Sequence, residues 1–327
     1  MKTVAIIGAG ISGITLANLL DSKVKCSIFD KSRGVGGRMA TRRAEPFQFN
    51  HGAQYFKVEN QQFKNFLMPL IKNKIIIPWK SDHIEVQNKA VIKRVKINNI
   101  KYYSGNTKMN SIVKYLARND FFIKLSCEIK KTKKIKNKWY IYDAKNTSYG
   151  PYDWIFFTIP PNQVTELLYK DFKYLDIIQK IQMRSCFTLM LGYREIKTFD
   201  FDTALFLNED IQWASVKKTY QEKQRFYNLL INSSYSFAEK NINSCKDLIF
   251  NYLLKKTADI LNIELDNYEH KAIHLWKYAM AEKKNNFGSF IDDNLQVIVC
   301  GDWCMNSRVE GAFLSAYNAV SKFLKYI

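Results

Sequence analysis

Short apolar runs separated by glycine-rich turns dominate the start of the chain. Residues 4–7 are four consecutive apolar residues, which is typical of a buried parallel strand, and residues 14–20 follow with the pattern of a helix. Residues 26–30 form a second strand-like run that ends in a carboxylate. The order strand, helix, strand indicates the opening unit of an α/β fold with a parallel sheet.

The later chain mixes strands and helices of a different kind. The further elements that the pattern predicts are a hydrophobic strand at 154–159, stopped by prolines, strands rich in aromatic and β-branched residues at 187–193 and 212–216, a buried strand at 297–300, and helices at 247–260 and 311–324. No repeat or low-complexity linker separates these segments. We therefore expect two domains that share the chain in alternating pieces.

The expected first domain is discontinuous and contains residues 1–60, 105–165 and 285–327. It combines a Rossmann-like parallel sheet with a β-meander whose hairpin precedes the strand at 154–159. Residues 61–104 and 166–284 are expected to form a second α+β domain, the substrate domain, built on a mainly antiparallel sheet.

The first glycine loop follows the first strand directly and reads Gly8-Ala9-Gly10-Ile11-Ser12-Gly13. Gly8 permits a tight turn, Gly10 lets the backbone approach a pyrophosphate, and Gly13 lets the helix pack closely on the strand. The helix start offers free N–H groups and the positive end of its dipole to phosphates. The alternative is a strand–helix turn that binds nothing, but the second strand and its terminal acid in the expected order argue against it.

Asp30 ends that second strand, where a carboxylate can accept hydrogen bonds from ribose hydroxyls. Either NAD or FAD fits this unit. The second cluster, Gly34-Val35-Gly36-Gly37-Arg38, adds another close backbone approach and a fixed cation beside the same site. Two anchors favour a tightly and non-covalently held FAD over a nicotinamide cofactor that comes and goes.

The segment from Asp30 to Arg43 resembles the glutathione-reductase-type flavoproteins of the amine-oxidase branch, and more narrowly the bacterial renalase-like group. Three further segments are similar to this family in the family's own order along the chain. They are His51-Gly52-Ala53-Gln54-Tyr55-Phe56, His274-Leu275-Trp276-Lys277-Tyr278-Ala279, and Cys300 to Cys304 followed by Arg308 to Ser315.

The resemblance implies an FAD site that draws on all of these segments. Besides the residues of the two glycine clusters and Asp30, it assigns to the cofactor Lys31, Met39, Ala53, Gln54, Tyr55, Gly301, Asp302, Val309, Glu310, Gly311 and Ala312. The residues themselves fit such a role. Asp302 comes at the end of a strand, and the last helix begins beside Glu310, where its dipole would stabilise negative charge on a reduced ring.

The resemblance also implies a reaction, which is hydride transfer to flavin N5 from the 1,2- and 1,6-dihydro isomers of NAD(P)H. Molecular oxygen then takes the electrons and gives hydrogen peroxide. Gln54, His274, Trp276 and Tyr278 are the candidates for the substrate side. The last three lie in phase on one strand and can stack on a nicotinamide ring, although an aromatic face inside the second domain's core explains them equally well. We assign His51 to structure.

Two other functions remain open. One is an amine oxidase or desaturase of the same fold, against which the scarcity of acids among the candidate residues argues mildly. The other is a flavin-bound protein whose role is to bind an anionic partner, suggested by the net charge of +20. The densest basic run, residues 130–138, lies on the expected hairpin without a nucleic-acid module, so a solvated edge is the default interpretation.

The cysteines and the lengths of the apolar runs bear on metal binding and on location in the cell. The six cysteines form no disulfide framework, and Cys300 and Cys304 lack the second pair of ligands that a metal site needs. No apolar run is long enough to span a bilayer, and no signal peptide precedes the first strand. We expect an enzyme without metal or membrane partner, acting in the cytoplasm on a small dinucleotide.

Overall fold

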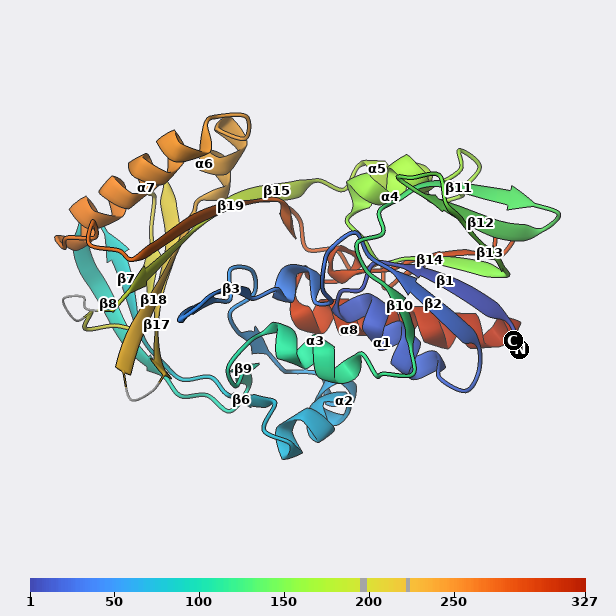
Figure 1. The fold of residues 1–327 in the computed structure, drawn as a ribbon, viewed down its shortest axis with the longest axis horizontal. Coiled ribbons are helices and arrows are strands. Elements are labelled where there is room, and N and C mark those ends of the chain that lie inside the picture. Colours follow the sequence, from blue (N-terminus) through green and yellow to red (C-terminus); the bar gives the residue numbers. More distant parts are fainter. Residues whose placement is uncertain (195–198, 222–223) are drawn as a thin grey trace.

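A six-stranded sheet forms the half of the molecule that contains both chain ends (Figure 1). The computed structural model describes residues 1–194, 199–221 and 224–327. The strands of this sheet, in spatial order, are β10 (Phe122–Lys124), β2 (Lys25–Phe29), β1 (Thr3–Ile7), β14 (Trp154–Phe157), β21 (Val297–Val299) and β20 (Phe290–Asp292). All neighbours pair in parallel except β20, which runs antiparallel to β21.

Strand β1 shows why this sheet is buried on both faces. Val4 and Ile6 face one hydrophobic core together with helices α1 (Ile11–Leu20) and α8 (Val309–Phe323). Ala5 and Ile7 face a second core on the other side. That side is covered by an antiparallel meander of β11 (Ile129–Ile135), β12 (Lys138–Asp143) and β13 (Ser148–Tyr152). The result is a three-layer, Rossmann-like unit with an added meander.

The other half is a seven-stranded sheet that is antiparallel except where β16 meets β7. Its order is β19 (His270–Ala281), β15 (Met183–Tyr193), β18 (Gln224–Ser233), β17 (Ile211–Gln221), β16 (Thr203–Phe206), β7 (Ser81–Gln87) and β8 (Ala90–Ile97). Helix α7 (Lys246–Leu261) packs on its outer face and, with α6 (Tyr235–Lys240), closes a separate core. Figure 1 shows that the inner face turns toward the parallel sheet.

Smaller elements connect and cover the two sheets. They are η1 (Gly37–Met39), β3 (Arg42–Ala44), β4 (Phe47–Phe49), β5 (Phe56–Lys57), α2 (Gln61–Lys72), β6 (Ile76–Pro78), β9 (Tyr102–Gly105), α3 (Asn110–Leu116), α4 (Pro161–Leu167), α5 (Leu175–Gln179), η2 (Asp302–Cys304) and η3 (Leu324–Tyr326). Strands β3 and β4 pair as a hairpin, and β5, β9 and β6 form a three-stranded sheet.

The mixed α/β fold expected from the sequence is confirmed, with a parallel sheet in one half and a mainly antiparallel sheet in the other. The place of α2 is informative, because the expected domain boundary at residue 60 puts it in the substrate domain. Phe63, Leu67 and Leu70 of this helix instead pack into the core that α1 and α8 share. The chain enters the antiparallel sheet only at β7. In the part of the chain that the structure describes, no helix is long and apolar enough to cross a membrane.

Candidate functional site

The first glycine loop joins β1 to α1 at the carboxyl edge of the parallel sheet. Gly8 adopts a φ of +110°, which L side chains rarely adopt. A Cβ on Gly13 would lie 2.0 Å from the carbonyl oxygen of Gly8, so only glycine lets the helix start this close to the turn. A Cβ on Gly10, by contrast, would meet no atom within 4 Å. Gly10 therefore faces open space, as a backbone that approaches a phosphate must.

The second glycine cluster lies against the first. Gly36 forms a bridge with Gly10, and its N–H donates to the carbonyl oxygen of Ala9 at 3.0 Å. Gly36 and Gly37 both have positive φ, and a Cβ on Gly37 would lie 3.4 Å from the Cα of Gly10. Because only backbone lies between the two clusters, both can approach one extended phosphate-bearing ligand.

Asp30 stands directly after β2, at the edge where this ligand would lie. One carboxylate oxygen accepts from the N–H of Ala9 at 2.7 Å, and the other accepts from the N–H of Ser32 at 2.7 Å. The carboxylate is thereby fixed in position and still half-exposed. Lys31 is exposed next to it, whereas Met39 is buried in the core beneath the second cluster.

Arg38 connects the start of the chain to its last segment. Its guanidinium pairs with the carboxylate of Asp302, whose side chain is 9% exposed, and also donates to the carbonyl oxygen of Ala279 at 3.1 Å. The carbonyl of Arg38 accepts from the N–H of Ala53 at 2.8 Å. A Cβ on Gly52 would collide with that same carbonyl at 2.0 Å. The segment that resembles the family's Gly-Ala-Gln-Tyr stretch is thus held against the second glycine cluster.

The first turn of α8 completes this group. Ser12 of α1 donates its hydroxyl to the carbonyl oxygen of Ala312 at 3.0 Å, and a Cβ on Gly311 would lie 1.8 Å from the carbonyl oxygen of Met305. Val309 is half-buried at the first position of the helix. Gly301 donates its N–H to Ser315 at 3.0 Å. The two helix starts, α1 and α8, therefore lie side by side, both close to the glycine clusters.

The side chain of Glu310, at the start of α8, contacts the segment that precedes α2. Its carboxylate accepts from the N–H groups of Glu59 at 2.6 Å and Asn60 at 3.0 Å. These groups precede α2, whose N-terminal N–H groups are capped by the side chain of Asn60. The Glu310 side chain thus joins α8 to α2 through one of its two carboxylate oxygens.

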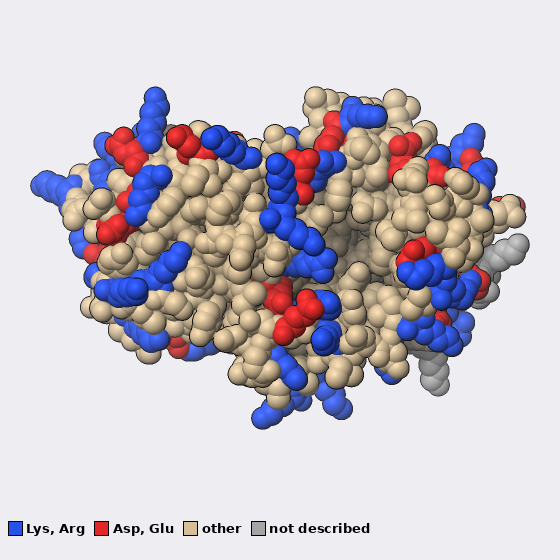
Figure 2. Space-filling model, turned by 180° about the vertical axis from the view of Figure 1, so that it is seen from behind, with Lys and Arg blue, Asp and Glu red and all other residues tan. Residues whose placement is uncertain are grey.

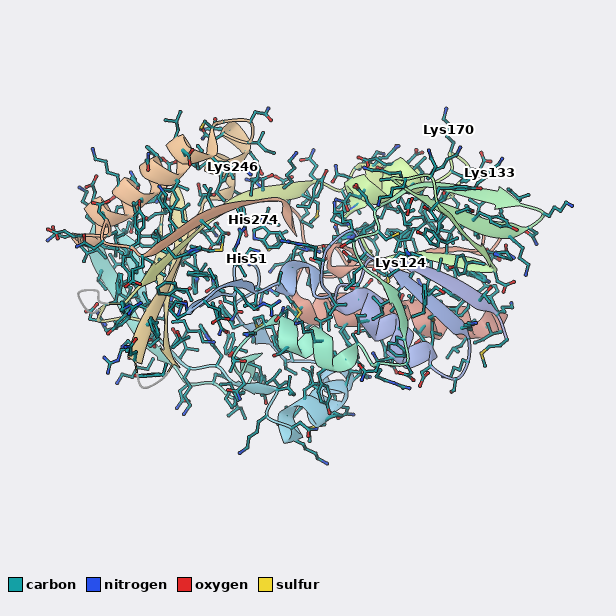
Figure 3. All side chains as sticks on the ribbon, in the orientation of Figure 1. His51, Lys124, Lys133, Lys170, Lys246 and His274 are labelled. Atoms are coloured by element: carbon teal, nitrogen blue, oxygen red, sulfur yellow. The ribbon has the colours of Figure 1, made fainter. Side chains whose placement is uncertain are left out.

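Three aromatic side chains meet on the inner side of the antiparallel sheet. His51 stacks on Trp276 with ring centroids 5.1 Å apart, and His274 lies edge-on to both rings, at 5.1 Å from His51 and 4.4 Å from Trp276. Figure 3 shows His51 and His274 close together between the two halves of the molecule. Tyr278 follows on β19 and is half-buried. The structure therefore brings His274 and Trp276 together with His51, which the sequence had suggested as structural.

These histidines are neutral at ordinary pH. Burial, helped by His274 and by the charge of Arg42, lowers the pKa of His51 to about 4. Burial and then Arg42 also lower the pKa of His274 and of His270. Their imidazoles can therefore donate and accept hydrogen bonds, but they contribute no positive charge of their own.

Gln54 and Tyr55 lie beside a second aromatic group that sequence reasoning missed. The side chain of Gln54 accepts from the indole N–H of Trp213 at 3.2 Å, and Tyr55 stacks on Trp79 with centroids 3.9 Å apart. His83 in turn stacks on Trp213. The strand around Trp213 was expected from its pattern, but no local signal ties it to Gln54, 159 residues away.

A hollow lies between the two halves of the molecule. Seen from behind, the surface is recessed between the parallel and antiparallel sheets, and Lys and Arg side chains gather along its edge next to a small acidic group (Figure 2). Within the described residues, no group of three or more His, Cys, Asp and Glu is arranged to hold a metal ion.

The comparisons with known proteins agree with this architecture. A family model described as an NAD(P)-binding Rossmann-like domain matches residues 6–70, which span both glycine clusters. A solved structure of a protein from Exiguobacterium sp. 255-15 assigned as a protoporphyrinogen oxidase superimposes with a TM-score of 0.74 at 11% identity, over 99% of each chain. A double mutant of putrescine oxidase from a redesign of cofactor binding gives 0.73, also at 11% identity and 99% of each chain. The chain is similar to these oxidases in fold.

Proposed function

We propose that this chain is an FAD-dependent oxidase of the renalase-like kind, acting on the 1,2- and 1,6-dihydro isomers of NAD(P)H. The two touching glycine clusters, the fixed carboxylate of Asp30 and the paired starts of α1 and α8 fit an extended dinucleotide cofactor. Open space over Gly10 is the most direct sign of that fit, because a phosphate needs it. The similarity in fold to oxidases supports a redox role.

Hydride would pass from the dihydropyridine to N5 of bound FAD, and oxygen would then take the two electrons. In balance, the dihydro isomer, O2 and one proton give NAD(P)+ and hydrogen peroxide. The chain's own residues bind and orient the substrate. The Trp276 ring, fixed by His51 and His274, offers a rigid surface for stacking. Gln54, three residues after His51 on the same loop, supplies an amide. A dihydropyridine releases hydride without a general base, so neutral imidazoles suffice.

The observation that carries the choice of substrate is the charge of the substrate side. Besides burial, the charge of Arg42 lowers the pKa of His51, His270 and His274. Lys217 is half-buried, and its ammonium group donates to the carbonyl oxygen of Thr107 at 2.9 Å. Two nearby carboxylates, Glu59 and Glu85, are paired with a lysine at 2.7 Å and 2.6 Å, and a third, that of Glu310, accepts from two backbone N–H groups. A positive site attracts a polyanionic dinucleotide and repels the ammonium form of an amine.

The test is an anaerobic stopped-flow experiment on the FAD-loaded protein. The isomer mixture from partial chemical reduction of NAD+ should bleach the flavin rapidly, whereas ordinary 1,4-NADH should not. An Arg42→Gln variant should need several-fold more substrate for half-maximal bleaching. Lys133→Gln, which removes a charge from the exposed meander (Figure 3), is the matched control and should behave like the wild type. Rapid bleaching by primary amines, with none by the isomers, would replace this proposal with an amine oxidase.

A further inference from the structure

Four aromatic side chains form a group around Tyr55, which follows Gln54 in the chain. Tyr55 and Trp79 are nearly parallel, with an interplanar angle of 8°, and Tyr102 lies against Tyr55 at 5.9 Å. Trp213 approaches from the antiparallel sheet, with its centroid 6.1 Å from that of Tyr55 and its plane inclined by 38°. All four are half-buried, unlike Trp139 and Trp303, which fill the cores. The group therefore borders the space between the two halves.

The rings of Tyr55 and Trp213 are each fixed by other side chains and are inclined to each other by 38°. We call the space between these two rings the wedge. Trp79 supports Tyr55, while the stacked ring of His83 and the oxygen of Gln54 hold Trp213. A planar ring inserted between two others needs centroids about 7 Å apart, since each stacking distance is about 3.5 Å. The observed 6.1 Å is close to this, so a small opening of the wedge admits one aromatic ring.

Cationic side chains lie near this wedge, although one of them, Lys57, is paired with Glu59 at 2.7 Å. The ammonium group of Lys57 lies 6.0 Å from the ring centre of Tyr102. Arg308 is exposed at the start of α8 and close enough to influence both Tyr55 and Lys57. Lys217 lies four residues beyond Trp213 on the same strand. An aromatic ring carrying phosphates therefore matches the group better than an apolar or cationic ligand does.

We propose that Tyr55 and Trp213 form a second aromatic platform that binds the adenine ring of the dinucleotide substrate, with Arg308 taking its phosphates. The inference rests on the proposed function, because it assigns the remote half of that substrate. At most about 14 Å of chain separates His51 from Tyr55. One dinucleotide can therefore reach both the His51–Trp276 surface and the wedge. The platform makes the enzyme select a dinucleotide over a free dihydropyridine.

The direct test uses ADP-ribose, which carries the adenine and the phosphates but no nicotinamide. Calorimetric titration into FAD-saturated protein should give binding that Trp213→Leu weakens about tenfold, the usual effect of losing one base–aromatic stack. Trp79→Leu removes the ring that supports Tyr55 and should weaken binding as well. Arg308→Gln, at an exposed position, should weaken binding and reduce its salt dependence. Tyr220→Leu is the control, since Tyr220 lies on the same strand as Trp213 but is 66% exposed.

Kinetics supply an independent measurement. The wild type should prefer dihydro-dinucleotide isomers over the corresponding mononucleotides in kcat/KM, and Trp213→Leu should reduce that preference about tenfold while Tyr220→Leu keeps it. Binding of ADP-ribose that is unchanged in both tryptophan variants would overturn the platform. Tryptophan-dependent binding of ADP-ribose to a protein whose flavin no dihydropyridine reduces would uphold the platform and refute the oxidase function.

Discussion

Trp276 is held against His51 by two contacts at once. Its indole N–H donates to the carbonyl oxygen of His51 at 2.9 Å, and the two rings stack with an interplanar angle of 26°. His51 is 8% exposed, and its Nδ1 has no hydrogen-bond partner among the described residues. The position of the Trp276 ring therefore depends on a buried imidazole, whose pKa burial lowers to about 4.

His51 should make the folded protein sensitive to acid. Its pKa is about 4 when folded and 6.5 in the unfolded chain, so the unfolded state binds the proton first as the pH falls. The stability from this residue is complete above pH 6.5 and is lost between pH 6.5 and 4, by about 2 kcal/mol at about pH 5. Urea unfolding of wild type and His51→Phe at neutral and mildly acidic pH measures the difference. The variant should lose less stability on acidification, and equal losses would contradict this account.

Arg38 and Asp302 should be strongly coupled. Removing the guanidinium in Arg38→Met leaves a carboxylate that is 9% exposed without its cation. We expect a loss of about 2–3 kcal/mol of unfolding free energy. Asp302→Asn in the same chain should restore part of it, because the uncompensated charge is then gone. A double-mutant cycle measured by urea unfolding of the FAD-free protein checks this, and additive effects of the two substitutions would mean that the ion pair contributes nothing.

The arrangement of the two glycine clusters and Asp30 could largely be predicted from the sequence because its determinants are local. A glycine at each of three positions directly after a buried strand, and an acid at the end of the next strand, define one short unit whose geometry follows from the backbone. The structure places Gly10 and Gly36 in direct contact, as two anchors of one ligand require. The expected strands and helices were likewise found, since their hydrophobic patterns are continuous along the chain.

The two aromatic groups, around Trp276 and around Tyr55, could not be predicted in the same way. Trp213 comes from β17, His83 from β7 and Trp79 from the connection between β6 and β7. Only the packing of the antiparallel sheet against the loop at Gln54 brings them together. His51 was suggested as structural because a lone histidine beside a glycine carries no signal of its own. Its pairing with Trp276 depends on where β19 crosses that loop. Glu310 was assigned to the cofactor, but its side chain reaches α2, a contact between elements 250 residues apart.

Substitution of Gly10 should abolish FAD retention, whereas substitution of Gly13 should lower the stability of the fold. Gly10→Val places its Cβ in open space, so the FAD-free protein should keep its melting temperature while FAD is no longer retained. Gly13→Ala forces a clash with the backbone of Gly8 and should cost about 3 kcal/mol or more of stability. Gly34→Ala, also in open space, serves as the control for Gly10. Calorimetric melting and flavin absorbance after gel filtration separate the effects. A Gly10→Val protein that stays yellow would contradict the assignment of a cofactor phosphate to this loop.

Glu310 should matter for stability more than for the cofactor. Its carboxylate accepts from two backbone N–H groups just before α2, and Glu310→Ala leaves both without a partner at the positive end of that helix. We expect a loss of about 1–2 kcal/mol in unfolding free energy, with Glu310→Gln recovering about half of it, because an amide oxygen still accepts but carries no charge. The affinity for FAD should stay within about twofold of the wild type, since the start of α8 would offer the cofactor its backbone and not this side chain. Fluorescence titration of the FAD-free variants with FAD measures that affinity. A large loss of FAD affinity with unchanged stability would mean that the Glu310 carboxylate turns from α2 to the cofactor when FAD binds.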